Sequence, residues 1–191
     1  MRPADDRQIR SALHTNLAAE HAQDGSLILD ELGIYGGATR VDVAVINGRF
    51  GGYEIKSDRD TLERLPTQAE LYGRVFDTMS LVAGPRHIDR AVDLLPAWWG
   101  VVLAAPGEDG GALLETIRTP QENRGQDPQT LAWCLWRAEL AAVLSEHGYR
   151  VMSRHSRPHL VRMAAELFSL DHLRRIVRET VKARGDWRAA P

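Results

Sequence analysis

The alternation of apolar and polar residues along the first part of the chain predicts helices and strands in turn. In residues 5–23, Ile9, Leu13 and Leu17 recur at helical spacing behind a pair of acidic residues. Residues 26–34 are short and apolar and suit either a strand or a last helical turn. The strongest β pattern follows, because RVDVAVI and RFGGYEIKS flank an Asn-Gly pair, which is typical of a hairpin.

Two helix patterns and three strand patterns continue from the hairpin. Residues 61–78 and 86–95 predict helices, whereas MSLVA, WWGVVLAA and ALLETIRT predict strands. Strand–helix–strand crossovers attached to a hairpin favour a mixed α/β sheet with helices on both faces. We therefore expect an α/β fold for this part of the chain.

The composition changes after Pro120. The polar segment QENRGQDPQ predicts a linker, and TLAWCLWRAELAAVLSEHG predicts one helix with apolar residues every three or four positions. Further helices are expected around 159–168 and 170–184. We therefore expect a core domain over residues 1–120 and a helical C-terminal subdomain over residues 121–191.

The composition is that of a globular protein. Of the 191 residues, 43% are hydrophobic and 26% charged, which does not suit a disordered or fibrous chain. The single cysteine, Cys134, excludes an internal disulfide framework and a cysteine-based zinc cluster. Because no apolar run approaches the roughly 18–20 residues that span a bilayer, and the N-terminus lacks a secretory pattern, we expect a cytoplasmic protein without a membrane partner.

Charge is distributed unevenly along the chain. The net charge is −2, but residues 150–191 carry ten Lys or Arg against four Asp or Glu, a net +6, which leaves −8 for residues 1–149. A basic C-terminal third suits the backbone phosphates of nucleic acid, and a solvated helix face with surplus arginine explains it equally well. The candidate phosphate-binding residues are Arg174, Arg175, Arg178, Lys182 and Arg184.

Two acids and a lysine occupy the hairpin, and its register decides whether they meet. With a two-residue turn, paired residue numbers sum to 95, so Asp42 opposes Tyr53 and Glu54 lies on the other face. With a three-residue turn, or with a bulge at glycines 51–52, the sum is 96 and Asp42 lies opposite Glu54. We predict the second register, with Lys56 on the same face.

Two carboxylates on one face of a sheet favour a bound cation, because their repulsion is costly without one. A pair of oxygen ligands suits Mg²⁺ or Mn²⁺, which activate water and stabilise charge on a phosphorus centre. Lys56 would position the attacking hydroxide or stabilise the developing charge. The pattern thus predicts phosphodiester hydrolysis, and the structural alternative is an exposed Glu–Lys ion pair beside a turn aspartate.

Asp42 followed by Glu54-Ile55-Lys56 after a hairpin resembles the motif of the PD-(D/E)XK superfamily of restriction-endonuclease-like nucleases, although Val41 stands where the motif has proline. RVDVAVINGRFGGYEIKSDRDTLERLPTQAELYGRVFD also resembles an uncharacterised bacterial family in that superfamily. The resemblance covers roughly residues 5–105. It implies a mixed four-stranded sheet flanked by helices.

The resemblance also implies roles for residues outside the hairpin. Glu31 would supply an additional metal-binding or water-orienting acid, and Asp30 beside it is the alternative. Gln68 and Tyr72 are similar to a Q-x-x-x-Y motif of exonuclease-like members, in which Gln68 would contact the site and Tyr72 the nucleic acid or the core. Four positions apart on a helix, the two side chains would share a face.

The expected activity is that of a Mg²⁺- or Mn²⁺-dependent nuclease with DNA as its substrate. Asp42 and Glu54, with Glu31, would bind the metal ion, and Lys56 and Gln68 would complete the catalytic set. A homodimer is compatible with cutting both strands. The alternative function is a non-catalytic nucleic-acid- or protein-binding module on the same fold.

Overall fold

The computed structural model describes residues 3–108 and 110–184. The chain divides into two compact units. Unit 1 comprises Met1–Leu32 and Val41–Arg124, and unit 2 comprises Gly33–Arg40 and Gly125–Pro191. The boundary between Arg124 and Gly125 lies four residues after the domain boundary expected at residue 120. The assignment of 33–40 to the helical unit does not follow from the sequence pattern.

A six-stranded sheet is the centre of unit 1. The strands lie in the order β1-β2-β3-β4-β5-β6. β2 and β3 are antiparallel, β4 is parallel to both β3 and β5, and β6 is antiparallel to β5. The predicted mixed α/β fold is therefore confirmed. The elements are α1 (Asp6–Glu20), β1 (Leu27–Ile34), β2 (Thr39–Ile46), β3 (Phe50–Lys56), α2 (Leu65–Gly73), β4 (Thr78–Ala83), α3 (Ile88–Leu94), β5 (Gly100–Pro106) and β6 (Ala112–Arg118), with short 3₁₀ turns at Tyr35–Gly37 and Pro85–His87.

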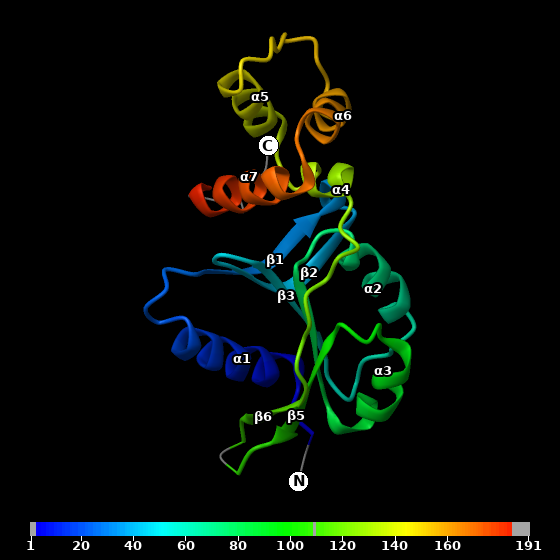
Figure 1. The fold of residues 1–191 in the computed structure, drawn as a ribbon. Helices are drawn as coiled ribbons and strands as arrows, with labels where there is room; N and C mark the ends of the chain where they lie inside the picture. Colours follow the sequence, from blue (N-terminus) through cyan, green and yellow to red (C-terminus); the bar gives the residue numbers. More distant parts are fainter. Residues whose placement is uncertain (1–2, 109, 185–191) are drawn as a thin grey trace. The chain divides into compact units, whose positions relative to one another are not determined.

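Helix α1 covers one face of this sheet, and α2 and α3 lie on the other side (Figure 1). A capping box starts α1, because Asp5 accepts the Gln8 N–H while the Gln8 side chain accepts the Asp5 N–H. The apolar stripe of α1 then packs on the sheet and forms one core with Val43, Val45, Ile55, Val82 and Ala104. This stripe is the one predicted from the helical spacing in the sequence.

The opposite face of the sheet is lined with aromatic rings. Tyr72 of α2 stacks on Trp99 with ring centroids 6.2 Å apart and meets Phe76 edge-on. Phe76 in turn packs edge-on against Phe50 of β3, at 4.7 Å. These ring contacts pack α2 against the middle strands of the sheet. A polar side chain of β3 that points to this face is therefore buried beneath α2.

The hairpin has the predicted register. Val43 pairs with Tyr53 and Ile46 with Phe50, so paired numbers sum to 96. The extra residue lies in a three-residue turn, 47–49, in which the Asn47 side chain accepts the Arg49 N–H at 2.8 Å. The alternative, a bulge at the two glycines, is not used, since both pair regularly with β2.

Gly52 is needed for packing and not for a bulge. A Cβ atom at this position would collide with the sulfur of Met79 and lie 3.2 Å from the ring of Phe76. Gly52 is therefore required by the close packing of its own and the neighbouring strand, not by the turn.

Unit 2 contains four helices among the described residues. They are α4 (Pro128–Ala132), α5 (Arg137–Glu146), α6 (Arg157–Leu167) and α7 (Leu170–Ala183). The last two agree with the expectation from the sequence, whereas the single helix expected over residues 130–148 is wrong. None of the helices in the described part of the chain is long and apolar enough to cross a membrane.

The break between α4 and α5 is stabilised by side chains from elsewhere in unit 2. Arg157 donates hydrogen bonds to the carbonyls of Trp133, at 2.8 Å, and Leu135, at 3.1 Å. Glu139 accepts the backbone N–H of Trp136 at 2.7 Å. Because these contacts satisfy backbone groups that a continuous helix would have paired internally, the break costs little.

Candidate functional site

Glu54 is the centre of a buried polar cluster on the α2 side of the sheet. Its side chain accepts hydrogen bonds from Lys56 Nζ at 2.5 Å, from Gln68 Nε2 at 2.6 Å and from the Tyr72 hydroxyl at 3.0 Å. Glu54 is 2% exposed and Lys56 6% exposed. We call these four residues the Glu54 cluster. Their burial rules out the alternative of a solvent-exposed ion pair.

Helix α2 supplies two members of the Glu54 cluster. The four-residue spacing of Gln68 and Tyr72 places both side chains over Glu54, as the shared helix face predicts. Tyr72 is fully buried, so contact between Tyr72 and nucleic acid, one of its two expected roles, is wrong and the core position is correct. The Oε1 atom of Gln68 is buried and has no hydrogen-bond partner among the described residues.

Asp42 lies beside the cluster on the first hairpin strand. The observed register, extended by one pair, places it opposite Glu54, and its Oδ2 atom accepts the backbone N–H of Ile55 at 2.7 Å. Burial raises the pKa of Glu54, and the Asp42 charge raises it further, while the Lys56 charge opposes both. The two carboxylates are therefore close enough to repel each other, as the register predicts.

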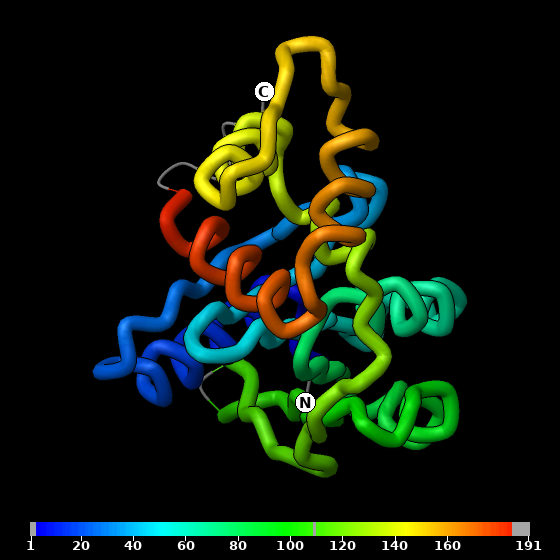
Figure 2. The backbone as a smooth tube through the Cα atoms, turned by 45° about the horizontal axis from the view of Figure 1, so that its top comes forward, coloured from blue at the N-terminus to red at the C-terminus, as the bar shows by residue number. Residues whose placement is uncertain are grey.

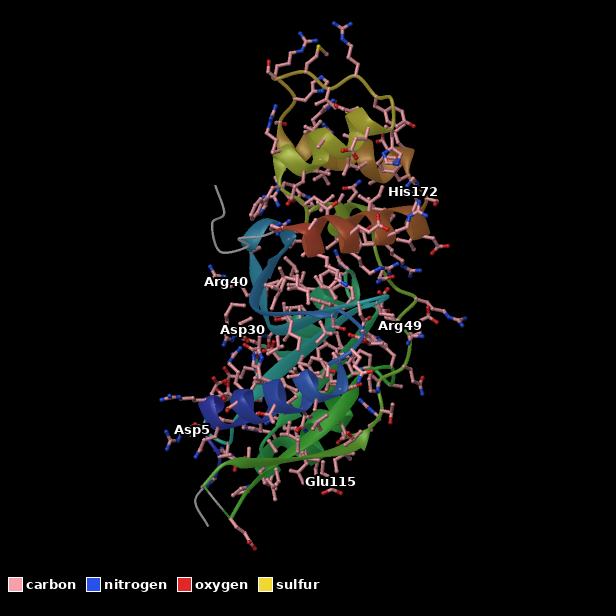
Figure 3. The ribbon with its side chains drawn as sticks, turned by 90° about the vertical axis from the view of Figure 1, so that its left-hand side faces the viewer. Asp5, Asp30, Arg40, Arg49, Glu115 and His172 are labelled. Carbon is pink, nitrogen blue, oxygen red and sulfur yellow. The ribbon has the colours of Figure 1, made fainter. Side chains whose placement is uncertain are left out.

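Arg10 of α1 joins Asp42 to two further acids. Its Nη1 atom donates to the Asp42 carbonyl at 2.8 Å and to Asp30 at 3.3 Å. Its Nη2 atom donates to the Asp42 carboxylate at 3.3 Å and to Glu31 at 3.2 Å. We call Arg10, Asp30, Glu31 and Asp42 the Arg10 hub. Figure 3 labels Asp30, which lies beside α1 and also accepts a 2.7 Å hydrogen bond from His14.

Although burial opposes the change, the carboxylates of Asp42 and Asp6 raise the pKa of Arg10. Its guanidinium is thus a fixed internal cation within a group of acids. Sequence reasoning missed Arg10. The available signal was its position, since Asp6, Arg10 and His14 recur every four residues alongside the apolar stripe of α1.

Glu31 is less closely tied to the site than the resemblance implies. Its side chain is 47% exposed, and it is joined to Asp42 through Arg10, which contacts both carboxylates. The backbone of Glu31 has a φ of 55°, in the left-handed region that a non-glycine residue occupies only at a cost of about 1–2 kcal/mol. Asp30, the alternative acid, is the more buried of the two and contacts both Arg10 and His14.

The basic residues proposed for phosphate contact differ in their surroundings. Arg184 forms two hydrogen bonds with Glu139, at 2.7 and 2.8 Å, and lies over the Trp136 ring. Its side chain is only 6% exposed and its charge is already paired, so little of it is available for the phosphate contact expected from the sequence. Arg174 forms an ion pair with Asp171 at 2.9 Å. The other three keep exposed or partly exposed side chains: Arg175, Arg178 and Lys182.

Asp42 and Glu54 suit a cation that keeps most of its own water. Among the described residues no group of three His, Cys, Asp or Glu is placed to hold a metal ion. The pair nevertheless offers the carboxylate oxygens that Mg²⁺ prefers, and a cation would relieve the repulsion that raises the pKa of Glu54. The buried Gln68 Oε1 could accept a hydrogen bond from a water molecule in the same place.

The fold and the site define a mixed α/β protein with a buried carboxylate–lysine cluster and a separate helical unit. The chain belongs to the family described as bacteriophage P4 protein cII, whose model matches residues 3–188. It is similar to Protein cII of Enterobacteria phage P4, with 24% identity over 179 residues, or 94% of this chain and 67% of that protein. No solved structure gives a significant match. Neither name states an activity.

Proposed function

We propose that this protein is a metal-dependent nuclease with a restriction-endonuclease-like fold, which hydrolyses phosphodiester bonds in DNA. The observation that carries the proposal is the buried Glu54–Lys56 pair beside Asp42, whose carboxylate accepts the backbone N–H of the intervening Ile55. Replacing a buried ion pair with apolar residues is often neutral or stabilising. A role in chemistry therefore explains the charged residues at this position better than stability does.

Each member of the site has a separate task in this proposal. Asp42 and Glu54 hold Mg²⁺ or Mn²⁺, which when bound lowers the pKa of a water molecule and stabilises charge at phosphorus. Lys56 orients the attacking water or donates to a phosphate oxygen. Gln68 and Tyr72 hold the Glu54 carboxylate in one orientation through their 2.6 and 3.0 Å hydrogen bonds.

A second candidate function is a non-catalytic nucleic-acid- or protein-binding module. One observation favours it, because both oxygens of Glu54 and both oxygens of Asp42 already accept hydrogen bonds from protein donors. On this alternative the cluster holds β2, β3 and α2 together, and Arg10 neutralises Asp42 permanently. Isothermal calorimetry separates the two functions, since an enzyme site should bind Mn²⁺ and lose that binding in Asp42→Asn.

The activity itself is tested with purified protein on supercoiled and linear DNA. We expect cleavage with Mg²⁺ or Mn²⁺, none with EDTA, and loss of cleavage in Asp42→Asn and Lys56→Met. Glu115→Gln is the matched control, because Glu115 is an exposed acid on β6 (Figure 3). Cleavage that survives in both site variants would end this mechanism.

Removing one partner of a buried pair costs roughly 3–5 kcal/mol, so the Lys56→Met protein must first be shown to fold. Circular dichroism provides that check. Asp42 is half-buried, with a side chain 22% exposed, and Asp42→Asn preserves its shape. This second variant keeps the mechanism testable even if Lys56→Met does not fold.

A further inference from the structure

Unit 2 carries a shallow hollow lined with cationic side chains at the start of α6. Its volume is about 450 Å³, and its lining residues are Arg154, His155, Ser156, His159 and Arg162. The hollow lies where the long connection from α5 enters α6, drawn in yellow to orange in Figure 2. We call it the cationic hollow. The nuclease site in unit 1 shares none of these residues.

The charges of the cationic hollow have no counter-ion in the described part of the chain. Arg154 and Arg162 are exposed and take part in no salt bridge or hydrogen bond of their side chains with described residues. The rings of His155 and His159 lie only 4.6 Å apart between their centroids. No carboxylate lines the hollow. Cations gathered in this way repel one another unless an anion joins them.

The backbone adds to the same electrostatic preference. α6 is 11 residues long, and its N-cap residue, Ser156, makes no side-chain capping hydrogen bond. The first helical turn therefore keeps the N–H groups of Arg157 and His159 without a side-chain acceptor. The positive end of the helix dipole lies at the same place, so both features add to the attraction that Arg154 and Arg162 exert on an anion.

Protonation of His155 should accompany the binding of an anion. Desolvation lowers the pKa of His155, and the nearby charges of His159, Arg154 and Arg137 lower it further. The Nδ1 atom of His155 accepts the Met152 N–H at 3.4 Å, so the neutral ring carries its proton on Nε2, from which it can be donated to an anion. A bound anion offsets these charges and so raises the pKa of His155. Binding then takes up protons.

We infer that the cationic hollow binds a phosphate group of a nucleic-acid strand. A phosphate is the anion that arginine and histidine bind with charge-assisted hydrogen bonds. The lining has no Trp, Tyr or Phe, and its exposed arginines suit the phosphates of a strand backbone. That the phosphate belongs to nucleic acid rests on the proposed function. The hollow thus provides strand contacts separate from the Asp42–Glu54 site.

Binding is measured by fluorescence anisotropy of a labelled single-stranded oligonucleotide with the full chain in EDTA. EDTA suppresses metal-dependent cleavage, so a failure of the nuclease proposal leaves this result interpretable. We expect Arg154→Ala/Arg162→Ala to bind at least about tenfold more weakly, with a salt slope smaller by roughly 1 for each phosphate that the variant no longer neutralises. Arg90→Ala/Arg124→Ala is the control, because both arginines are exposed and the charge change is equal.

The pH dependence provides the second readout. We expect tighter binding at pH 6 than at pH 8 in the unmodified chain, and a smaller pH dependence in His155→Gln. This single variant also keeps the inference testable if the double arginine variant does not fold. Equal affinities of the double variant and its control would overturn the inference. Inorganic phosphate that shifts the histidine NMR resonances, without oligonucleotide binding, would overturn the nucleic-acid assignment and leave a small-anion site.

Discussion

Arg10→Met is the most informative single change in unit 1. The substitution removes the guanidinium of the Arg10 hub and keeps an unbranched side chain of similar reach. Asp30, Glu31 and Asp42 are then left without their shared cation, and the Asp42 carbonyl without a 2.8 Å hydrogen bond. We expect lower thermal stability at neutral pH and a larger stabilising effect of Mg²⁺.

The structure sets the size of the effect. The contacts of Arg10 with its three carboxylates are long, at 3.2 to 3.3 Å, and its side chain is 22% exposed. A hydrogen bond to a charged group contributes about 1.5–3 kcal/mol when buried, and exposed ion pairs contribute about 0–1 kcal/mol. A total destabilisation of about 2 kcal/mol follows, which corresponds to a decrease in Tm of roughly 4–8 °C for a chain of this length.

Circular dichroism during heating measures this difference, with Arg90→Met on exposed α3 as the control. An ion bound at Asp42 replaces the missing cation, so millimolar Mg²⁺ should raise the Tm of Arg10→Met more than that of the unmodified chain. Equal Tm values of the unmodified chain and Arg10→Met without Mg²⁺ would refute a stabilising role of the Arg10 hub. Equal increases in the two Tm values with Mg²⁺ would refute competition between Arg10 and the ion for Asp42.

Two further changes test the cluster and the sheet. Burial and the Asp42 charge raise the pKa of Glu54, so its contribution to stability is greatest below the ordinary glutamate pKa of about 4.3 and falls as pH rises through the folded value. The stability of the unmodified chain relative to Glu54→Gln, measured by urea unfolding from pH 4 to 7, should therefore decline, and parallel profiles would contradict this. Gly52→Ala should cost about 1–3 kcal/mol because its Cβ meets Met79. Gly48→Ala, with open space around it, should be nearly neutral in the same urea experiment, and equal destabilisation of the two variants would show that the packing argument is wrong.

The parts of the site that lie close in sequence could be predicted from it. The register needs only a choice between two turn lengths, and the chosen register, extended by one pair, places Asp42 opposite Glu54. The four-residue spacing of Gln68 and Tyr72 was enough to bring both to one carboxylate. Strand pairing and helical periodicity are local rules, so they operate before tertiary packing is known.

The features that depend on distant packing could not be predicted. Lys56 alternates like a surface residue, but it is only 6% exposed and its ammonium group pairs with Glu54. The helix break before α5 depends on Arg157, which follows it by about twenty residues. Gly52 resembled a bulge residue because nothing in the sequence shows that Met79 packs against it. In each case tertiary contacts decided a position that local pattern left open.

Asp42 contacts both the hairpin residues that the sequence predicted for the site and Arg10, which it did not. One of its oxygens accepts the Ile55 N–H, which holds it beside Glu54, and the other accepts from Arg10. The first contact is a property of the hairpin and is independent of any ligand. The second is a cation contact, and a metal ion and a guanidinium compete for the same carboxylate charge. In a nuclease, the metal ion must replace Arg10 as the partner of the Asp42 carboxylate. In a binding module, the Arg10–Asp42 ion pair is retained. The response of Arg10→Met to Mg²⁺ therefore decides between the two proposed functions without relying on cleavage.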